Sequence, residues 1–158
     1  METIVNYDVK LTTWPEKTFV TKRGRIKFDE LSTFFGEAYG ALYAVIQKLG
    51  LTPDGMPYAI YYDIDEFSKE TDVAAAVAVQ GKVPEIKGFD KVVLPTSKVL
   101  STTHYGAYEN MASAYDALDK YVRQNSLKKE MVLEEYFSDP VQEKDSSKWK
   151  TNIHFVVR

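Results

Sequence analysis

Residues 19–50 read FVTKRGRIKFDELSTFFGEAYGALYAVIQKLG, and the spacing of the apolar residues changes within this stretch. Residues 19–26 are typical of an extended segment, whereas apolar side chains recur at helical spacing over residues 29–49. Asp29 is a suitable N-terminal cap, and Gly50 is a usual stop signal for a helix. The stretch therefore predicts a strand followed by a long helix.

Two glycines, Gly36 and Gly40, lie four residues apart inside this predicted helix. Each costs about 1 kcal/mol relative to alanine in a helix interior. We therefore expect other backbone or a ligand to approach the helix closely at these positions.

The spacing of apolar residues also predicts strands and a helix in the rest of the chain. Apolar and polar residues alternate from Val5 to Leu11, which predicts a half-buried first strand. A second helix is expected from Glu109 to Gln124, with Tyr115 on its apolar stripe. Further strands are expected at residues 58–62, 73–80, 99–105, 131–137 and 151–157, with a connector at 81–98 and a polar loop at 138–150.

After the first strand, the order strand, helix, strand, strand occurs twice. We therefore expect one α+β domain over residues 1–158, with repeat halves at about 16–81 and 98–158. The two halves would be related by pseudo-twofold symmetry, with two main helices on an antiparallel sheet and a natural cleft between the halves.

The composition limits the classes of partner. The net charge is −3, and no dense cluster of basic residues is present, so we expect no direct binding to nucleic acid. No signal peptide and no apolar run long enough for a membrane span is found, which predicts a cytoplasmic protein without membrane contact. The absence of cysteine fits a reducing compartment.

No metal or cofactor is expected either. The only histidines, His104 and His154, are 50 positions apart and lack a ligand-like spacing. His154 alternates with polar and apolar neighbours in a way that favours a surface role. No phosphate-binding glycine loop and no nucleophile-elbow motif is present.

The chain is rich in aromatic residues, with 11 Tyr, 8 Phe and 2 Trp. Tyrosine and tryptophan suit apolar surfaces that need a polar tip, so the excess indicates a binding cleft, with a tyrosine-rich core as the alternative. The aromatic candidates for ligand binding are Tyr39, Tyr43, Tyr61, Tyr62, Tyr136 and Trp149.

Several short motifs occur in a characteristic order over residues 16–158. They are Arg23-Gly24, Phe34–Ala38, Pro57–Asp63, Thr103–Tyr108, Glu134–Pro140 and Trp149–Ile153. In this order the chain resembles the GyrI-like small-molecule-binding fold, which also forms the effector-binding domain of AraC-type and MerR-type transcription regulators.

The resemblance implies two strand-helix-strand-strand units with ligands bound in the groove between them. Such regulators sense lipophilic cations and other drugs, and they join this domain to a helix-turn-helix part that we do not expect here. Relatives without that part include a protein that protects DNA gyrase and hydrolases that open strained cyclopropane rings of alkylating natural products.

Glu134 is the leading candidate for a site carboxylate. The family pattern selects it, and strand alternation places it with Val132 and Tyr136. Alternation alone could equally favour Glu135, which shares the other face with Leu133 and has more apolar company. The alternative to a site is that both are half-exposed strand carboxylates.

Three functions remain open on the sequence. The favoured one is a sensor or sequestering domain that binds an amphipathic, cationic or aromatic small molecule. The second is a hydrolase of strained alkylating natural products that uses Glu134. The third is a regulatory partner of a protein, either gyrase or a separate DNA-binding regulator.

Overall fold

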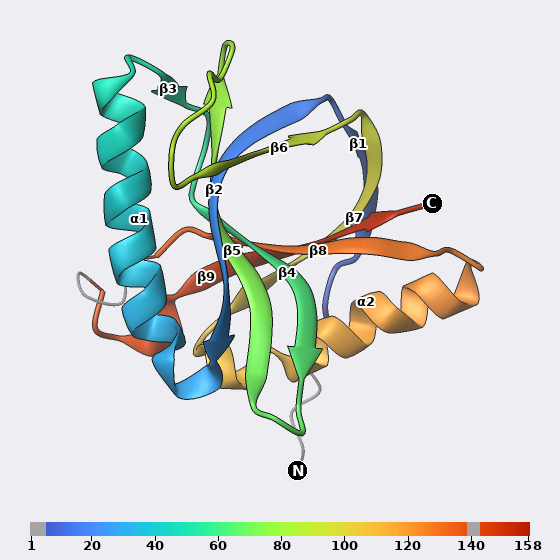
Figure 1. Cartoon of the computed structure of the whole chain (residues 1–158). Coiled ribbons are helices and arrows are strands. Elements are labelled where there is room, and N and C mark those ends of the chain that lie inside the picture. The colour runs from blue at the N-terminus through green and yellow to red at the C-terminus, as the bar shows by residue number, and fades with distance from the viewer. Residues whose placement is uncertain (1–5, 139–142) are drawn as a thin grey trace. The chain divides into compact units, whose positions relative to one another are not determined.

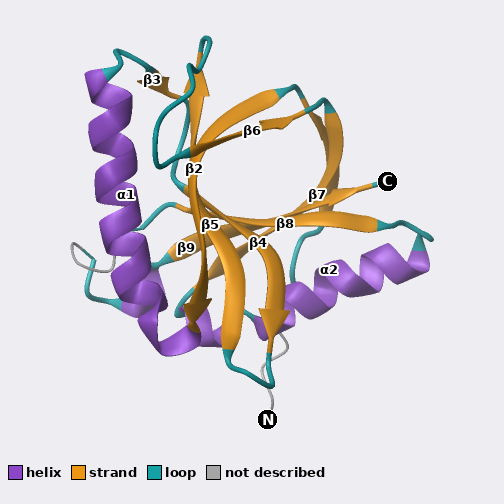
Figure 2. Cartoon of the chain, viewed as in Figure 1, coloured by secondary structure: helices purple, strands orange, loops and turns teal. Residues whose placement is uncertain are grey.

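The computed structural model describes residues 6–138 and 143–158, so Asp139 and Pro140 of the sequence motif lie outside the described residues. The chain divides into two compact units. The first unit is Pro15–Thr96, and the second unit combines the chain up to Trp14 with Ser97–Arg158. Each unit has one main helix and an antiparallel sheet, so the fold class is α+β (Figures 1 and 2).

The first unit follows the order strand, helix, strand, strand with two additions. Its elements are β2 (Lys17–Lys27), η1 (Phe28–Glu30), α1 (Leu31–Lys48), β3 (Thr52–Pro53), β4 (Tyr58–Asp65), β5 (Glu70–Gln80) and β6 (Asp90–Leu94). The strands are hydrogen-bonded in the order β4-β5-β2-β6, every pair is antiparallel, and the short β3 pairs with β5.

Helix α1 is held on this sheet by one apolar stripe. Ala38, Leu42 and Ile46 are spaced four residues apart and are fully buried. They pack in one cluster with Val20 of β2 and Ala75 of β5.

The second unit repeats the order strand, helix, strand, strand, but its additional edge strand comes before this repeat, whereas β6 follows it in the first unit. Its elements are β1 (Lys10–Trp14), β7 (Ser97–Tyr105), η2 (Tyr108–Asn110), α2 (Ala112–Gln124), β8 (Lys129–Tyr136), η3 (Ser146–Lys148) and β9 (Lys150–Val157). The antiparallel order is β8-β9-β7-β1, which matches β4-β5-β2-β6 strand for strand. The predicted repeat is therefore present in the order and pairing of the elements. The single-domain limits and the halves at 16–81 and 98–158 stay predictions.

Helix α2 covers one face of the second sheet. Ala114 and Leu118 of the helix are fully buried against Leu100, Ile153 and Phe155. The same sheet face carries, on β8, Val132, Glu134 and Tyr136, as the strand register requires.

Two predictions of elements are wrong. The expected first strand begins only at Lys10: Tyr7 and Val9 do pack on the α2 core, but residues 6–9 form no ladder. The segment 81–98, expected to be a connector, contains β6, a short edge strand that continues the sheet next to β2.

For the two helix glycines, the expected close approach of other backbone is wrong, and the alternative of a ligand stays a prediction. A Cβ atom added at Gly36 or Gly40 would meet no atom within 4 Å. No described backbone therefore approaches α1 at these two positions.

Candidate functional site

Glu134 is placed under α2 by the alternation of β8. The residue is 9% exposed, and its side chain lies on the face of the second sheet that the helix covers. Tyr115 projects from α2 onto the same face, where it packs near Phe155. The assignment of Glu134 to a ligand site stays a prediction.

Two tyrosine hydroxyls hold the carboxylate. Tyr115 donates to Oε2 of Glu134, and Tyr136 donates to Oε1 at 2.7 Å. Burial raises the pKa of the Glu134 carboxyl, and these two hydrogen bonds partly oppose that rise. Among the described residues, no lysine or arginine forms an ion pair with Glu134.

An aromatic cluster continues from Tyr136. The ring of Tyr108 lies 5.8 Å from that of Tyr136 and 4.9 Å from that of Trp149. Trp149 donates from Nε1 to the carbonyl of Glu143 at 2.6 Å, which fixes the indole orientation. The structure thus brings the predicted Glu134, Tyr136 and Trp149 together in one unit.

A buried hydroxyl lies beside this cluster. Thr151 is fully buried and is the register partner of both Tyr136 and His104. Its Oγ1 finds no hydrogen-bond partner among the described residues. A group of this kind is commonly satisfied by a ligand or an ordered water.

Sequence reasoning missed Tyr115, Tyr108 and Thr151 as members of the site. Tyr115 was recognised only as part of the apolar stripe of a helix. A tyrosine on such a stripe needs a partner for its hydroxyl, which is the signal that could have selected it.

Glu135 faces the other side of the sheet. Its Oε1 accepts from Nε2 of His154 at 2.9 Å, and both side chains are largely buried. The expected surface role of His154 is therefore wrong. Glu135 thus has His154 as a partner, whereas the partners of Glu134 among residues 6–138 and 143–158 are tyrosines.

The other four predicted residues lie in the first unit. Tyr39 donates to the carbonyl of Tyr58 at 2.7 Å. Tyr43 and Tyr62 are 36% and 37% exposed, and burial of the remainder raises the pKa of each hydroxyl. Tyr61 lies on β4 and is half-buried. Their assignment to a ligand site stays a prediction.

Arg23 stacks on one of these rings. Its guanidinium lies 3.7 Å from the ring centroid of Tyr62, and it forms two hydrogen bonds with Asp72 at 2.8 and 2.9 Å. The Arg23 guanidinium lowers the pKa of the Asp72 carboxyl. This face of Tyr62 is therefore already occupied by a cation from the protein.

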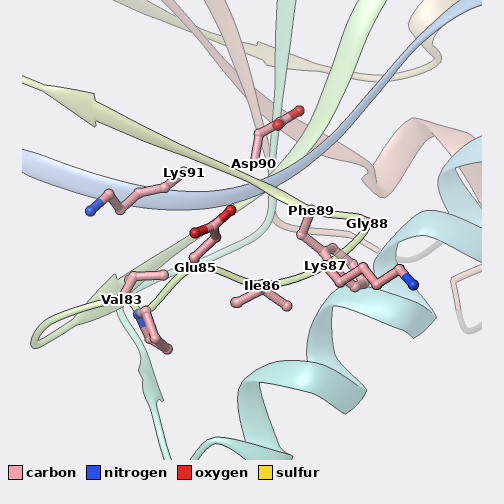
Figure 3. Close-up of a pocket in the computed structure, with 9 residues that line it drawn as sticks. Val83, Glu85, Ile86, Lys87, Gly88, Phe89, Asp90 and Lys91 are labelled. Carbon is pink, nitrogen blue, oxygen red and sulfur yellow. The ribbon is translucent and has the colours of Figure 1, made fainter.

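Glu134 does not line either of two cavities found in the described part of the chain. One, of about 420 Å³, lies in the first unit within the curve of residues 83–91, with Glu85, Asp90 and Lys91 around it (Figure 3). The other, of about 590 Å³, lies in the second unit next to Ser101 and Asn152.

The described residues contain no group of three or more acidic or histidine side chains arranged to hold a metal ion. None of the described helices is long and apolar enough to cross a membrane.

The model of the GyrI-like small molecule binding domain family matches residues 7–158. The chain belongs to this family. No curated protein is similar enough in sequence to count as a relative.

Several solved structures share the fold. A cryo-EM structure of the EcmrR–DNA complex in EcmrR-RPo has a TM-score of 0.82 and 24% identity, and the match covers 96% of this chain but 57% of that one. A hydrolase encoded by lin2189 from Listeria innocua has a TM-score of 0.71 and 14% identity, with 95% and 91% covered. The protein SAV2435, bound to tetraphenylphosphonium, has a TM-score of 0.62 and 18% identity, with 98% and 94% covered.

The protein therefore has a GyrI-like small-molecule-binding domain, and it shares its fold with the EcmrR C-terminal domain. It spans little more than half the length of EcmrR.

Proposed function

We propose that the protein binds an amphipathic aromatic cation at Glu134 and acts as a sensor or sequestering domain for such compounds. The observation that carries the proposal is the buried Glu134 carboxylate, which has two tyrosine hydroxyls and no cation beside it among the described residues.

The negative charge of the buried Glu134 carboxylate is not balanced by a positive charge from the described residues. Removing a carboxylate from water is unfavourable unless donors or a cation compensate it. The hydroxyls of Tyr115 and Tyr136 supply two hydrogen bonds but no positive charge. A ligand cation would complete the compensation, and it would gain most where its charge approaches the carboxylate.

The surrounding rings suit the apolar part of such a ligand. Tyr108, Tyr136 and Trp149 form one continuous aromatic cluster. Cation–π contacts contribute about 0.5–2 kcal/mol each, depending on desolvation. SAV2435, a protein of the same fold, is bound to tetraphenylphosphonium in its solved structure, and compounds of this type are suitable probes.

The test compares methyltriphenylphosphonium with triphenylphosphine oxide, which keeps the three phenyl rings without a net charge. For the intact protein we expect calorimetry to show tighter binding of the cation. Glu134→Gln keeps the shape and removes the charge, and should weaken cation binding by about 1–3 kcal/mol, or roughly 5- to 150-fold. Binding of the oxide should change little.

Two further variants complete this experiment. Glu130→Gln, on the same strand and ion-paired with Arg158 at the surface, removes an equal charge and should leave the preference intact. A larger cation-specific loss from Glu135→Gln would assign the ligand to the other carboxylate. Equal losses for both ligands in Glu134→Gln would overturn the proposal.

A hydrolytic role for Glu134 is the second candidate. A carboxyl with a raised pKa next to tyrosine hydroxyls can serve as a general acid or base. In that case Glu134→Gln should abolish turnover of a strained cyclopropane substrate, while the affinity for that substrate should change little. A protein partner, gyrase or a separate DNA-binding regulator, stays a prediction.

A further inference from the structure

The face of the second sheet opposite α2 carries a row of polar residues. Ser101 on β7 is the register partner of His154 on β9. Glu135 on β8 is the register partner of Asn152, which is two residues from His154, so all three side chains lie on the same face of the sheet. None of these three side chains belongs to the Glu134 cluster, which lies on the helix-covered face.

The three side chains are joined by short hydrogen bonds. Ser101 Oγ lies 2.6 Å from Nδ1 of His154, and His154 Nε2 lies 2.9 Å from Oε1 of Glu135. The side chains of His154 and Glu135 are only 6% and 13% exposed. A carboxylate accepts but does not donate, so Nε2 carries the proton, and in the neutral imidazole Nδ1 accepts from the serine hydroxyl.

This arrangement gives each group a defined role. Glu135 fixes the tautomer and orientation of the imidazole, and His154 is placed to accept the proton of Ser101. The edge contact of Trp14, whose ring lies 4.6 Å from that of His154, restrains the ring further. Nucleophile, base and orienting carboxylate are the three parts of a serine hydrolase triad.

Ser101 also has access to a ligand. It lines the cavity of about 590 Å³, together with Lys10, Thr103 and Asn152. The Thr103 hydroxyl donates to Oδ1 of Asn152 at 2.7 Å, and no described residue accepts from Nδ2 of that amide. The Nδ2 group is therefore available to donate to an oxygen that gains negative charge within the cavity.

We propose that Ser101, His154 and Glu135 form a catalytic site that hydrolyses small acyl esters. Ser101 Oγ forms a bond to the carbonyl carbon as its proton passes to Nδ1 of His154. The ester C–O bond then breaks, and the departing alcohol takes this proton.

Water completes the cycle by attacking the acyl-serine, with His154 accepting one proton of the water. The bond to Ser101 breaks, the serine oxygen recovers that proton, and a carboxylic acid is released. Ester and water are converted to acid and alcohol with no other reactant. Glu135 balances the positive charge that the imidazole carries in both steps.

The direct test uses an alkyl fluorophosphonate, which forms a stable bond to activated serines, followed by mass spectrometry of the peptides. We expect stoichiometric labelling at Ser101 and none in Ser101→Ala. Ser97→Ala is the matched control, because Ser97 lies on the same strand and should leave labelling unchanged. A label on another residue, or an unlabelled Ser101 in folded protein, would overturn the proposal.

Steady-state hydrolysis of p-nitrophenyl acetate tests the role of Glu135 as a positioning residue. Glu135→Gln lets the amide donate to Nε2, which would move the imidazole proton to Nδ1 and remove the base. We expect kcat to fall roughly 100-fold or more, with KM changed less than about threefold. Equal kcat in the parent protein and Ser101→Ala would refute the mechanism, and circular dichroism of each variant confirms its folding.

Discussion

The hydroxyl of Tyr115 donates to the carboxylate of Glu134, and this bond joins the first turn of α2 to β8. The contact links the packing of the helix to the protonation and charge of the candidate site. Any ligand that changes the charge balance at Glu134 would also act on the attachment of α2.

The first prediction concerns stability and pH. Burial raises the folded-state pKa of Glu134 above its ordinary value of 4.5, so the folded protein holds this proton more tightly than the unfolded chain does. The contribution of Glu134 is therefore fully favourable below about pH 4.5 and is lost as the pH rises from there through the raised pKa. Glu134→Gln should become more stable relative to the parent protein across that window.

Urea unfolding from pH 4 to 8 measures this difference. Asp72 has a lowered pKa, so its contribution is lost as the pH falls, but it is common to both proteins and cancels in the comparison. A difference in free energy of unfolding that does not depend on pH would contradict the assignment.

The second prediction separates the hydrogen bond from the bulk of Tyr115. Tyr115→Phe removes one of the two donors that lower the pKa of Glu134, so that pKa should rise further. Carboxyl chemical shifts of ¹³C-labelled glutamate follow the titration. We expect a loss of about 1–3 kcal/mol in the free energy of unfolding where Glu134 is charged.

Tyr121→Phe is the control for this change. Tyr121 lies on the same helix, and its hydroxyl forms no hydrogen bond with another described residue. If Glu134 titrates at the same pH in Tyr115→Phe as in Tyr121→Phe, the Tyr115 hydroxyl does not stabilise the charged carboxylate, and the prediction is wrong.

The third prediction concerns the glycines of α1. Gly40→Ala should raise the free energy of unfolding by up to about 1 kcal/mol, because the new Cβ meets nothing and alanine favours the helix. Gly24→Ala should give a smaller gain than Gly40→Ala, since its Cβ would lie 3.2 Å from Cδ1 of Ile26 and that side chain would have to shift. Chemical denaturation measures the free energy of unfolding of both variants. A loss of stability in Gly40→Ala would contradict the prediction, because it would mean that some group does lie close to α1 at this position.

The helices and long strands could be predicted because their apolar spacing is regular. Strand β6 could not, since Pro84, Gly88 and Pro95 around it are typical of a connector and its partner β2 is distant in sequence. The prediction of a strand at residues 6–9 was wrong because its alternating pattern has another cause. Tyr7 and Val9 alternate toward the core, but alternation records burial and does not require strand pairing.

The candidate site was only partly predictable. Alternation on β8 separates Glu134 from Glu135, yet only packing of α2 determines which face meets Tyr115. The Ser101–His154 contact depends on the register of β7 with β9, which no local pattern records.

The last prediction tests the unsatisfied hydroxyl beside the aromatic cluster. Thr151→Val replaces the buried Oγ1, which has no partner among the described residues, with a methyl group of similar size. Removing an unpaired buried hydroxyl should raise the free energy of unfolding by about 1–2 kcal/mol.

Thr102→Val should have the opposite effect. Thr102 is also buried on the helix-covered face, but its hydroxyl donates to the carbonyl of Asp8 at 3.0 Å. The substitution would leave that acceptor without its partner and should lower the free energy of unfolding by about 1–2 kcal/mol. Denaturation of both variants without ligand decides the matter, because a loss of stability in Thr151→Val would show that water already satisfies this hydroxyl in solution.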